Sequence, residues 1–159
     1  MTLSSQIKWL SSAHSAGLAE VHALAFPVEG AWGAAAFSDL LNQPAIYGLG
    51  AFVEGELSSF ALIQVVTDTA EILTLATRPN VERSGLASQL LSWFERHMPE
   101  KGAQTWLLDV AADNQKATSF YKKIGFEIDG RRPGYYKRLE GKRIDAILMS
   151  KHVSRQVSM

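Results

Sequence analysis

The stretch best suited to chemistry is Ser84-Gly85-Leu86-Ala87, which brings three small residues to the start of a helical pattern. An apolar run of strand length precedes it, and apolar residues then recur at helical spacing up to Phe94. A helix that begins at Gly85 presents unpaired backbone N–H groups and a partial positive charge at its first turn. Phosphate binds such a turn, since small side chains let it come close to the backbone. The alternative is that Gly85 and Ala87 only let a helix pack tightly on a sheet.

The elements that would position this turn follow from hydrophobic periodicity and turn residues. Strands are expected over Ile7–Leu10, Ile46–Val53, Leu57–Val66, Ala70–Thr77, Trp106–Val110, Phe126–Ile128 and Ile144–Met149, with Glu54-Gly55-Glu56 as a hairpin turn. Helices are expected after a cap at Ser15, over Trp32–Leu41, over Gly85–Met98 with Gly102 as its stop, and from a cap at Asp113 or Asn114 to Gly125. This order predicts a mixed sheet with helices on both faces, whose central strands are parallel where a helix crosses over.

Length and composition bound the class of protein. With 159 residues, 47% of them apolar, the chain suits a single domain over residues 1–150, followed by a flexible tail over residues 151–159 that lacks an apolar pattern. The absence of cysteine excludes disulfides, thiolate metal sites and cysteine nucleophiles, and the four histidines show no metal-binding spacing. No apolar stretch reaches the ~20 residues of a membrane span. We therefore expect a soluble cytoplasmic protein with no metal and no membrane partner.

Charge is distributed unevenly, although the formal net charge is zero. Residues 1–77 hold seven acids and a single base, Lys8, whereas residues 78–159 hold fifteen bases and nine acids. Eight of these bases lie between Lys122 and Arg143. Such a cluster is typical either of a surface that binds phosphate or nucleic acid or of a solvated hairpin. We favour the hairpin, and expect no direct nucleic-acid binding.

Two motifs support a resemblance to a known family. Residues 82–87 (ERSGLA) fall on the pattern Q/R-x-x-G-x-G/A with one departure, and residues 114–126 match N-x-x-A-x-x-x-Y-x-x-x-G-F. With these motifs, residues 60–149 resemble the GNAT superfamily of acetyl-CoA-dependent N-acetyltransferases. Within it the chain is most similar to the RimI-type enzymes, which acetylate the N-terminal alanine of a small-subunit ribosomal protein. The segment 131–149, with Tyr135-Tyr136, carries the similarity to the RimI type in particular.

The resemblance implies a GNAT fold of class α/β (α+β), with a mostly antiparallel sheet of six to seven strands. The fourth and fifth strands would splay apart to receive acetyl-CoA as cosubstrate. Pantetheine would pair like a strand with the backbone of Leu75, Ala76 and Thr77. Pyrophosphate would lie on the backbone amides of Arg83, Ser84, Gly85, Leu86, Ala87 and Ser88. Asn114 would cap its helix, contact pantetheine, or do both.

One residue of the phosphate motif departs from the family pattern. Glu82 stands where the motif has Gln or Arg, and it places an acid near a polyanion. Arg78 and Arg83 are close enough in sequence to offset this carboxylate. The main contacts would in any case come from backbone N–H groups.

The resemblance also assigns the groups that move protons. An amine attacks a thioester only after a base has taken its proton, and an acid then protonates the departing thiolate. Tyr121 matches the family's acid. Asp109 stands where RimI-type enzymes carry a glutamate on the fifth strand, and Glu71 stands where histone-acetylating members carry their base. Of these two carboxylates, we expect Asp109 to be the main general base. The structural alternatives are that Tyr121 is a core aromatic residue, that Glu71 lies exposed at a strand edge and that Asp109 only orients a loop.

The expected acceptor is a protein N-terminus or peptide, basic in character, such as that of a ribosomal protein. Glu20, Glu29 and Asp39 in the acidic half would attract it. Trp32 and Phe37 either wall the acceptor pocket or pack in the core. Two alternatives remain open: a GNAT enzyme that acts on a small amine, an antibiotic or a lysine, and a CoA-binding domain without catalysis that serves as a sensor or interaction module.

Overall fold

A seven-stranded sheet forms the centre of the computed structural model, which describes residues 4–27, 32–97 and 103–153. The strand order is β1-β2-β3-β4-β5-β7-β6, and β4 and β5 are parallel whereas the other neighbouring pairs are antiparallel. The strands are β1 (Gln6–Leu10), β2 (Ile46–Val53), β3 (Glu56–Val66), β4 (Thr69–Thr77), β5 (Thr105–Ala111), β6 (Glu127–Lys137) and β7 (Arg143–His152). The predicted fold class, a mostly antiparallel sheet with one parallel pair where a helix crosses over, is confirmed.

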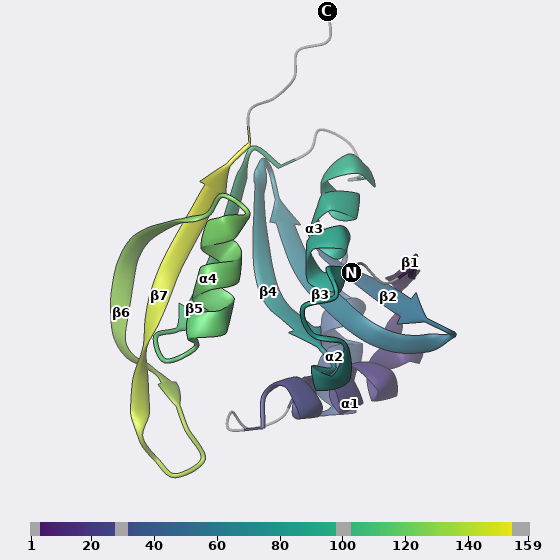
Figure 1. Cartoon of the computed structure of the whole chain (residues 1–159), viewed down its shortest axis with the longest axis horizontal. Coiled ribbons are helices and arrows are strands. Elements are labelled where there is room, and N and C mark those ends of the chain that lie inside the picture. Colours follow the sequence, from purple (N-terminus) through teal and green to yellow (C-terminus); the bar gives the residue numbers. More distant parts are fainter. Residues whose placement is uncertain (1–3, 28–31, 98–102, 154–159) are drawn as a thin grey trace, which may run out of the picture.

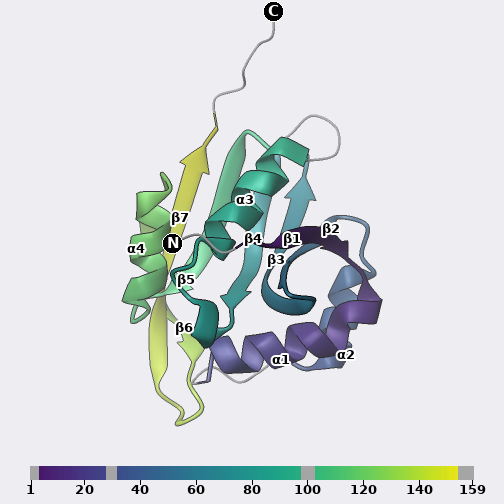
Figure 2. The same ribbon diagram turned by 45° about the vertical axis from the view of Figure 1, so that its right-hand side comes forward.

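Helices cover both faces of this sheet, as predicted. Figure 1 shows α3 and α4 in front of the sheet, and Figure 2 shows α1 lying across the lower end of the molecule beside α2. The helices are α1 (Ser15–Ala25), α2 (Ala34–Leu41), α3 (Leu86–His97) and α4 (Gln115–Lys123), with short 3-10 helices at Ser12–His14 and Pro79–Val81. In the part of the chain that the structure describes, no helix is long and apolar enough to span a membrane.

The core consists of two hydrophobic clusters separated by the sheet, and β3 contributes to both. Ala61 and Ile63 belong to the cluster beneath α3 and α4, whereas Phe60 and Leu62 belong to the cluster beneath α1 and α2. All four side chains are fully buried, because β3 is a central strand covered on both faces. Burial of such side chains contributes roughly 1.5–3 kcal/mol each. The two helical layers are therefore held on one rigid strand.

The start of α1 differs from the prediction that Ser15 caps it. Ser15 is the first residue of the helix, and its hydroxyl donates to the Ser12 carbonyl at 2.6 Å. The residue before α1 is His14, which makes no side-chain capping hydrogen bond to that helix. The Ser11 hydroxyl caps the preceding 3-10 helix, where it accepts from the backbone N–H of Ala13 and His14 completes a reciprocal capping box. Several serines in one short stretch offered the same capping chemistry, so the sequence did not distinguish them. The second predicted helix begins at Ala34 rather than at Trp32.

The hairpin turn between β2 and β3 is confirmed, with φ of 51° at Glu54 and 80° at Gly55. Positive φ at both central residues is the geometry of a type I′ turn. The last helix is also confirmed, because Asn114 caps α4 and Gly125 ends it with φ of 107°. The predicted stop of α3 at Gly102 lies outside the described residues.

The C-terminal part of the sheet is more extensive than predicted. The strand expected at Phe126–Ile128 is β6, which continues to Lys137 and forms a long hairpin with β7 at the left of Figure 1. As an edge strand β6 pairs only with β7 and lies largely exposed, so it shows no apolar alternation, and Pro133 lies where its register shifts. The flexible tail predicted over residues 151–159 is wrong for its first three residues, because Lys151 and His152 belong to β7 and Val153 donates its N–H to the Gln104 carbonyl at 2.8 Å. The remaining residues of the predicted tail lie outside the described part of the chain.

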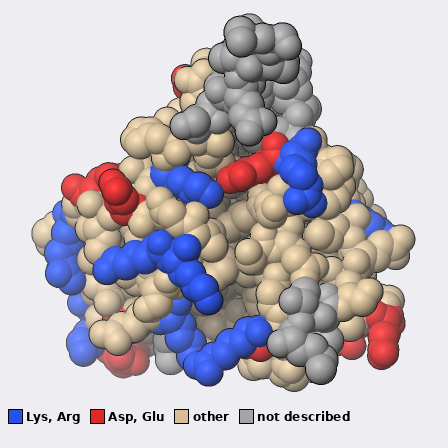
Figure 3. Space-filling model, turned by 45° about the horizontal axis from the view of Figure 1, so that its top comes forward, with Lys and Arg blue, Asp and Glu red and all other residues tan. Residues whose placement is uncertain are grey.

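Many bases of the C-terminal half are paired with carboxylates. Lys and Arg side chains gather on the left and lower part of the face in Figure 3. Ion pairs that involve bases of the C-terminal half include Arg131–Asp145, Arg132–Asp109, Arg138–Asp113, Lys116–Glu82 and Lys151–Glu95. Three of the eight bases between Lys122 and Arg143 are paired in this way, namely Arg131, Arg132 and Arg138, which fits the interpretation of the cluster as a solvated hairpin.

Candidate active site

The parallel strands β4 and β5 separate halfway along their length. They pair over Thr69–Ile72 and Thr105–Leu108, and no pairing continues from Leu73 to Thr77 or from Asp109 to Ala111. The register on the β3 side skips Leu73, which marks a bulge at the same point. Backbone polar groups on the inner edges of this splay lack a strand partner, and an extended ligand can supply one. The predicted pantetheine contacts Leu75, Ala76 and Thr77 all lie in this unpaired part of β4.

The turn that was predicted to bind pyrophosphate has the conformation of an anion site. Arg83 and Gly85 have φ of 63° and 86°, and the first hydrogen bond that closes α3 runs from Gln89 N–H to the Gly85 carbonyl at 2.9 Å. The amides of Leu86, Ala87 and Ser88 precede that bond and therefore have no carbonyl within the helix to donate to. A left-handed Arg costs roughly 1–2 kcal/mol, which the surrounding fold must offset.

The side chains of this turn hold it against the core. Leu86 is 1% exposed and belongs to the cluster beneath α3, and the Ser84 hydroxyl donates to the Val81 carbonyl. Arg83, Gly85 and Ser88 are exposed, and Ala87 is half-buried. The fold thus fixes the backbone of the turn while leaving its outer side open, which fits the pyrophosphate of acetyl-CoA.

Glu82 is neutralised, but by a different residue from those suggested by the sequence. Its carboxylate lies 3.2 Å from the ammonium of Lys116, in the first turn of α4. Arg78 does not offset it, because the Arg78 guanidinium contacts Glu20 and Glu56. The acid in the phosphate motif thus links the turn before α3 to the start of α4 and has a cation beside it.

The start of α4 is fixed by Asn114, whose side-chain oxygen accepts from the Ala117 N–H at 3.1 Å. Its backbone carbonyl also accepts from the Thr118 hydroxyl at 3.1 Å. The expectation that Asn114 caps the helix is therefore confirmed, and its contact with pantetheine stays a prediction. This cap sets the position of Tyr121, two turns further along the same helix.

Tyr121 lies in the core beneath α4 with 7% of its surface exposed. Its ring centroid is 5.2 Å from that of Phe120 and 5.4 Å from that of Phe126. Burial raises the pKa of the Tyr121 hydroxyl above its ordinary value, and proximity to Tyr136 adds to the shift. At neutral pH the hydroxyl is protonated, as it would also be at its ordinary pKa, so it has a proton to donate.

Asp109 and Glu71 project from the same face of the sheet. Trp106, Leu108 and Ile72 are buried beneath α3 and α4, so strand alternation directs the two carboxylates to the opposite face. Glu71 pairs with Leu107, and strand spacing then puts the Cα atoms of Glu71 and Asp109 roughly 8 Å apart. Asp109 is the first residue of β5 beyond the last pair with β4, at the mouth of the splay, whereas Glu71 lies in the closed part.

Arg132 is a neighbour of this site that the sequence did not indicate. Its guanidinium lies 4.0 Å from the Asp109 carboxylate and 4.7 Å from the centre of the Tyr135 ring. β7 lies between β5 and β6, so the contact depends on strand register and leaves no local sequence signal. Phe37 is fully buried and stacks edge-on against Phe60, so it packs in the core and does not wall a pocket.

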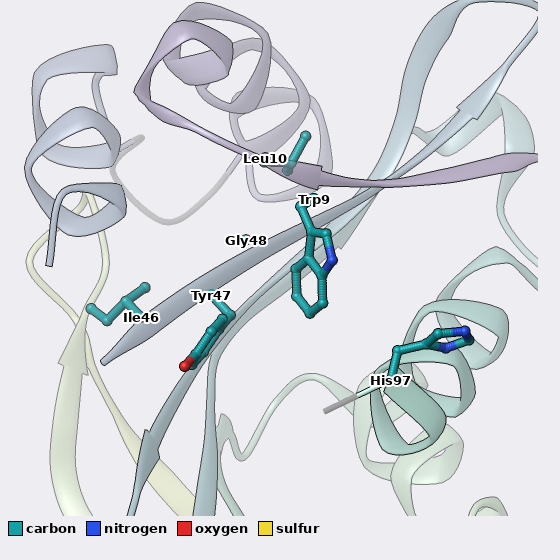
Figure 4. Close-up of a pocket in the computed structure, with 6 residues that line it drawn as sticks. All are labelled: Trp9, Leu10, Ile46, Tyr47, Gly48 and His97. Atoms are coloured by element: carbon teal, nitrogen blue, oxygen red, sulfur yellow. The ribbon is translucent and has the colours of Figure 1, made fainter. Parts of the chain in front are cut away.

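A cavity of about 430 Å³ lies elsewhere, at the β1 edge of the sheet. It is lined by Trp9, Leu10, Ile46, Tyr47, Gly48 and His97. Figure 4 shows Trp9 and Tyr47 side by side with His97 across from them on α3. None of the predicted site residues lines this cavity, so its volume does not mark the candidate active site, which stays at the splay and the turn before α3.

Comparison with known proteins shows both a family and a similar enzyme. Residues 16–126 match the model of the acetyltransferase (GNAT) family. The chain is 35% identical over 100 residues to the [ribosomal protein bS18]-alanine N-acetyltransferase of Escherichia coli, a span that covers 63% of this chain and 67% of that protein.

Solved structures share the fold. The crystal structure of the Escherichia coli ribosomal-protein alanine N-acetyltransferase superposes with a TM-score of 0.83 at 24% identity, covering 98% of this chain and 100% of that one. NAA60 of Arabidopsis thaliana, in complex with acetyl-CoA, superposes with a TM-score of 0.77 at 20% identity, covering 94% and 99%.

Proposed function

The chain belongs to the GNAT family of acetyltransferases, and from that premise we propose that its acceptor is the N-terminal α-amine of a protein, such as a ribosomal protein. Acetyl-CoA-dependent N-acetyl transfer is the activity of the family. The observation that carries the proposal is the position of Asp109, a carboxylate at the mouth of the splay. The similarity to an enzyme named for the N-terminal alanine of a ribosomal protein supports the class of acceptor. The reaction would take place in the cytoplasm, where ribosomes assemble.

Two parts of the chain would hold acetyl-CoA. The backbone of Leu75, Ala76 and Thr77 would pair with pantetheine, and the amides from Arg83 to Ser88 would bind pyrophosphate, with Asn114 at the side of the pantetheine. The bound thioester supplies an activated acetyl group. Backbone N–H groups on the open edge of β4 would hold the carbonyl oxygen of that group and stabilise the charge that develops on it.

Asp109 would act as the general base, directly or through one water, and Glu71 is the alternative. An α-amine has a pKa near ~8, against ~10.4 for a lysine side chain, so at neutral pH the neutral fraction of the α-amine is about two hundred times larger. A weak carboxylate base is therefore adequate for an α-amine. Arg132 balances the charge of Asp109 before the substrate binds.

Tyr121 would donate a proton to the departing thiolate. The hydroxyl carries its proton at neutral pH, and its burial limits the access of bulk water. The cap at Asn114 and the stop at Gly125 fix the helix that carries it.

We keep a basic acceptor peptide as part of the proposal, but not all of the acids that the sequence suggested are available to attract it. Glu20 is paired with Arg78, and Glu29 lies outside the described residues. Asp39 is exposed on α2, and Asp109 and Glu71 line the face that the amine would approach. These carboxylates would draw in a cationic N-terminus, an attraction that salt weakens.

To test the proposal, a bacterial extract that contains ribosomes is incubated with the protein and isotope-labelled acetyl-CoA. Mass spectrometry then locates the label. Label on protein N-termini, led by alanine on a ribosomal protein, is the expected result. Label on lysine side chains or on small amines would move the acceptor to those classes. If the protein binds CoA but transfers no label, the result would favour the alternative of a CoA-binding domain without catalysis.

A further inference from the structure

Arg78 is a buried cation between the end of β4 and Pro79, with 9% of its surface exposed. Its Nε donates to the Leu57 carbonyl at 2.7 Å and lies 3.2 Å from a carboxylate oxygen of Glu56. Its Nη1 donates to a carboxylate oxygen of Glu20 at 3.2 Å. A buried guanidinium is stable only with such partners, so the three contacts fix its position. They tie the end of β4 both to α1 and to the β2–β3 hairpin.

The part of β4 next to Arg78 has less support than the rest of the sheet. From Leu73 onward the strand has β3 on one side and the splay on the other. The Arg78 backbone N–H donates to the Ser58 carbonyl at 2.9 Å, which is the last backbone-to-backbone hydrogen bond to β3 at this end of β4. An inner strand is normally held by hydrogen bonds to a neighbour on each side. At this end of β4 the contacts of the Arg78 side chain take the place of the missing hydrogen bonds to β5.

A hydrogen-bonded series leads from Arg78 into the phosphate-binding turn. The Arg78 carbonyl accepts from the Val81 N–H at 3.0 Å, and the Val81 carbonyl accepts from the Ser84 hydroxyl. Ser84 lies between the two residues with left-handed backbone, Arg83 and Gly85. These two hydrogen bonds connect the position of Arg78 to the turn whose amides would face the pyrophosphate.

We propose that Arg78 is a positioning residue for the pyrophosphate of acetyl-CoA, an inference that rests on the proposed function. Held by Glu20, Glu56 and the Leu57 carbonyl, it fixes the point where the chain leaves the sheet, and with it the direction of the amides that follow. Arg78 does not itself touch the ligand. Its fork-shaped guanidinium is required, because the single ammonium of lysine does not reproduce the same set of contacts.

The test compares Arg78→Met and Arg78→Lys with Arg96→Met, a control at an exposed arginine near the end of α3. Glu20 and Glu56 have side chains 63% exposed, so they are solvated when the guanidinium is removed, and we expect the variants to fold. Calorimetry measures the Kd for CoA, thermal unfolding without ligand checks the fold, and kinetics compare acetyl-CoA with S-acetylpantetheine, which lacks the pyrophosphate.

Both Arg78 variants should raise the Kd for CoA and lower kcat/KM for acetyl-CoA by about tenfold, while kcat/KM for S-acetylpantetheine stays within about twofold. The control should match the wild type. Equal losses with both thioesters, or an unchanged Kd, would overturn the role of Arg78. If Arg78→Met does not fold, the double variant Glu20→Gln, Glu56→Gln takes its place under the same criteria. A wild-type protein that does not bind CoA would instead refute the proposed function.

Discussion

Replacing Tyr121 with phenylalanine removes the proposed proton donor and keeps the aromatic ring. The ring contacts with Phe120 and Phe126, at 5.2 and 5.4 Å between centroids, remain in the variant. Since only a hydroxyl is lost from a buried site, we expect the free energy of unfolding at neutral pH to change by no more than about 1 kcal/mol. The Kd for acetyl-CoA should be unchanged.

The rate should respond much more strongly than the stability. A positioned general acid contributes 10²–10⁴-fold, so we expect Tyr121→Phe to lower kcat by about a hundredfold, equivalent to about 2.7 kcal/mol of transition-state stabilisation. Steady-state kinetics with an alanine-terminated peptide measure this loss, and chemical denaturation measures the stability. A variant with wild-type kcat and reduced stability would show that Tyr121 is a core aromatic residue only.

The raised pKa of Tyr121 makes a second readout available. In the unfolded chain the hydroxyl ionises at its ordinary pKa of 10.0, whereas burial raises the pKa in the folded protein. The stabilisation linked to this group is therefore fully present below pH 10 and is lost as the pH rises toward the folded pKa. Wild type should lose more stability than Tyr121→Phe between about pH 9.5 and pH 11. If the free energy of unfolding changed with pH in the same way for the two proteins, the claim that burial raises the pKa of the Tyr121 hydroxyl would be refuted.

Three further changes test other parts of the site. Asp109→Asn should lower kcat/KM by about tenfold or more at pH 7, with a smaller effect from Glu71→Gln; the reverse order, with acetyl-CoA binding intact, would move the base to β4 and favour a lysine acceptor. Gly85→Glu should abolish CoA binding in calorimetry, because the new side chain strains a left-handed position and puts a carboxylate at the phosphate turn; a folded variant with normal affinity would exclude this turn as the site. A basic alanine-terminated peptide should have a higher kcat/KM than an acidic one at low salt, and equal values would refute electrostatic selection of the acceptor.

The sequence predicted the features of the fold that depend on local signals. Gly85 at the phosphate turn, the cap at Asn114 and the stop at Gly125 each act within one helical turn, and the structure places all three as expected. Strand β6 was mostly missed, because an exposed edge strand does not need an apolar pattern.

Contacts between distant segments were beyond the reach of sequence patterns. Arg78 donates to Glu20 across 58 positions of sequence, and Lys116 donates to Glu82 across 34. The proximity of Arg78 to Glu82 in sequence suggested a pair that the folded chain does not form. Surface charges have many oppositely charged partners within reach of their flexible side chains, and only the packed elements decide among them.

The most direct test of the central claim uses one peptide that carries both kinds of amine, an N-terminal alanine and an internal lysine. The protein and acetyl-CoA are incubated with it at pH 7, and tandem mass spectrometry locates the acetyl group. The account predicts acetylation of the α-amine, lost in a peptide whose N-terminus is already blocked. Acetylation of the lysine in both peptides, with the α-amine left free, would contradict it.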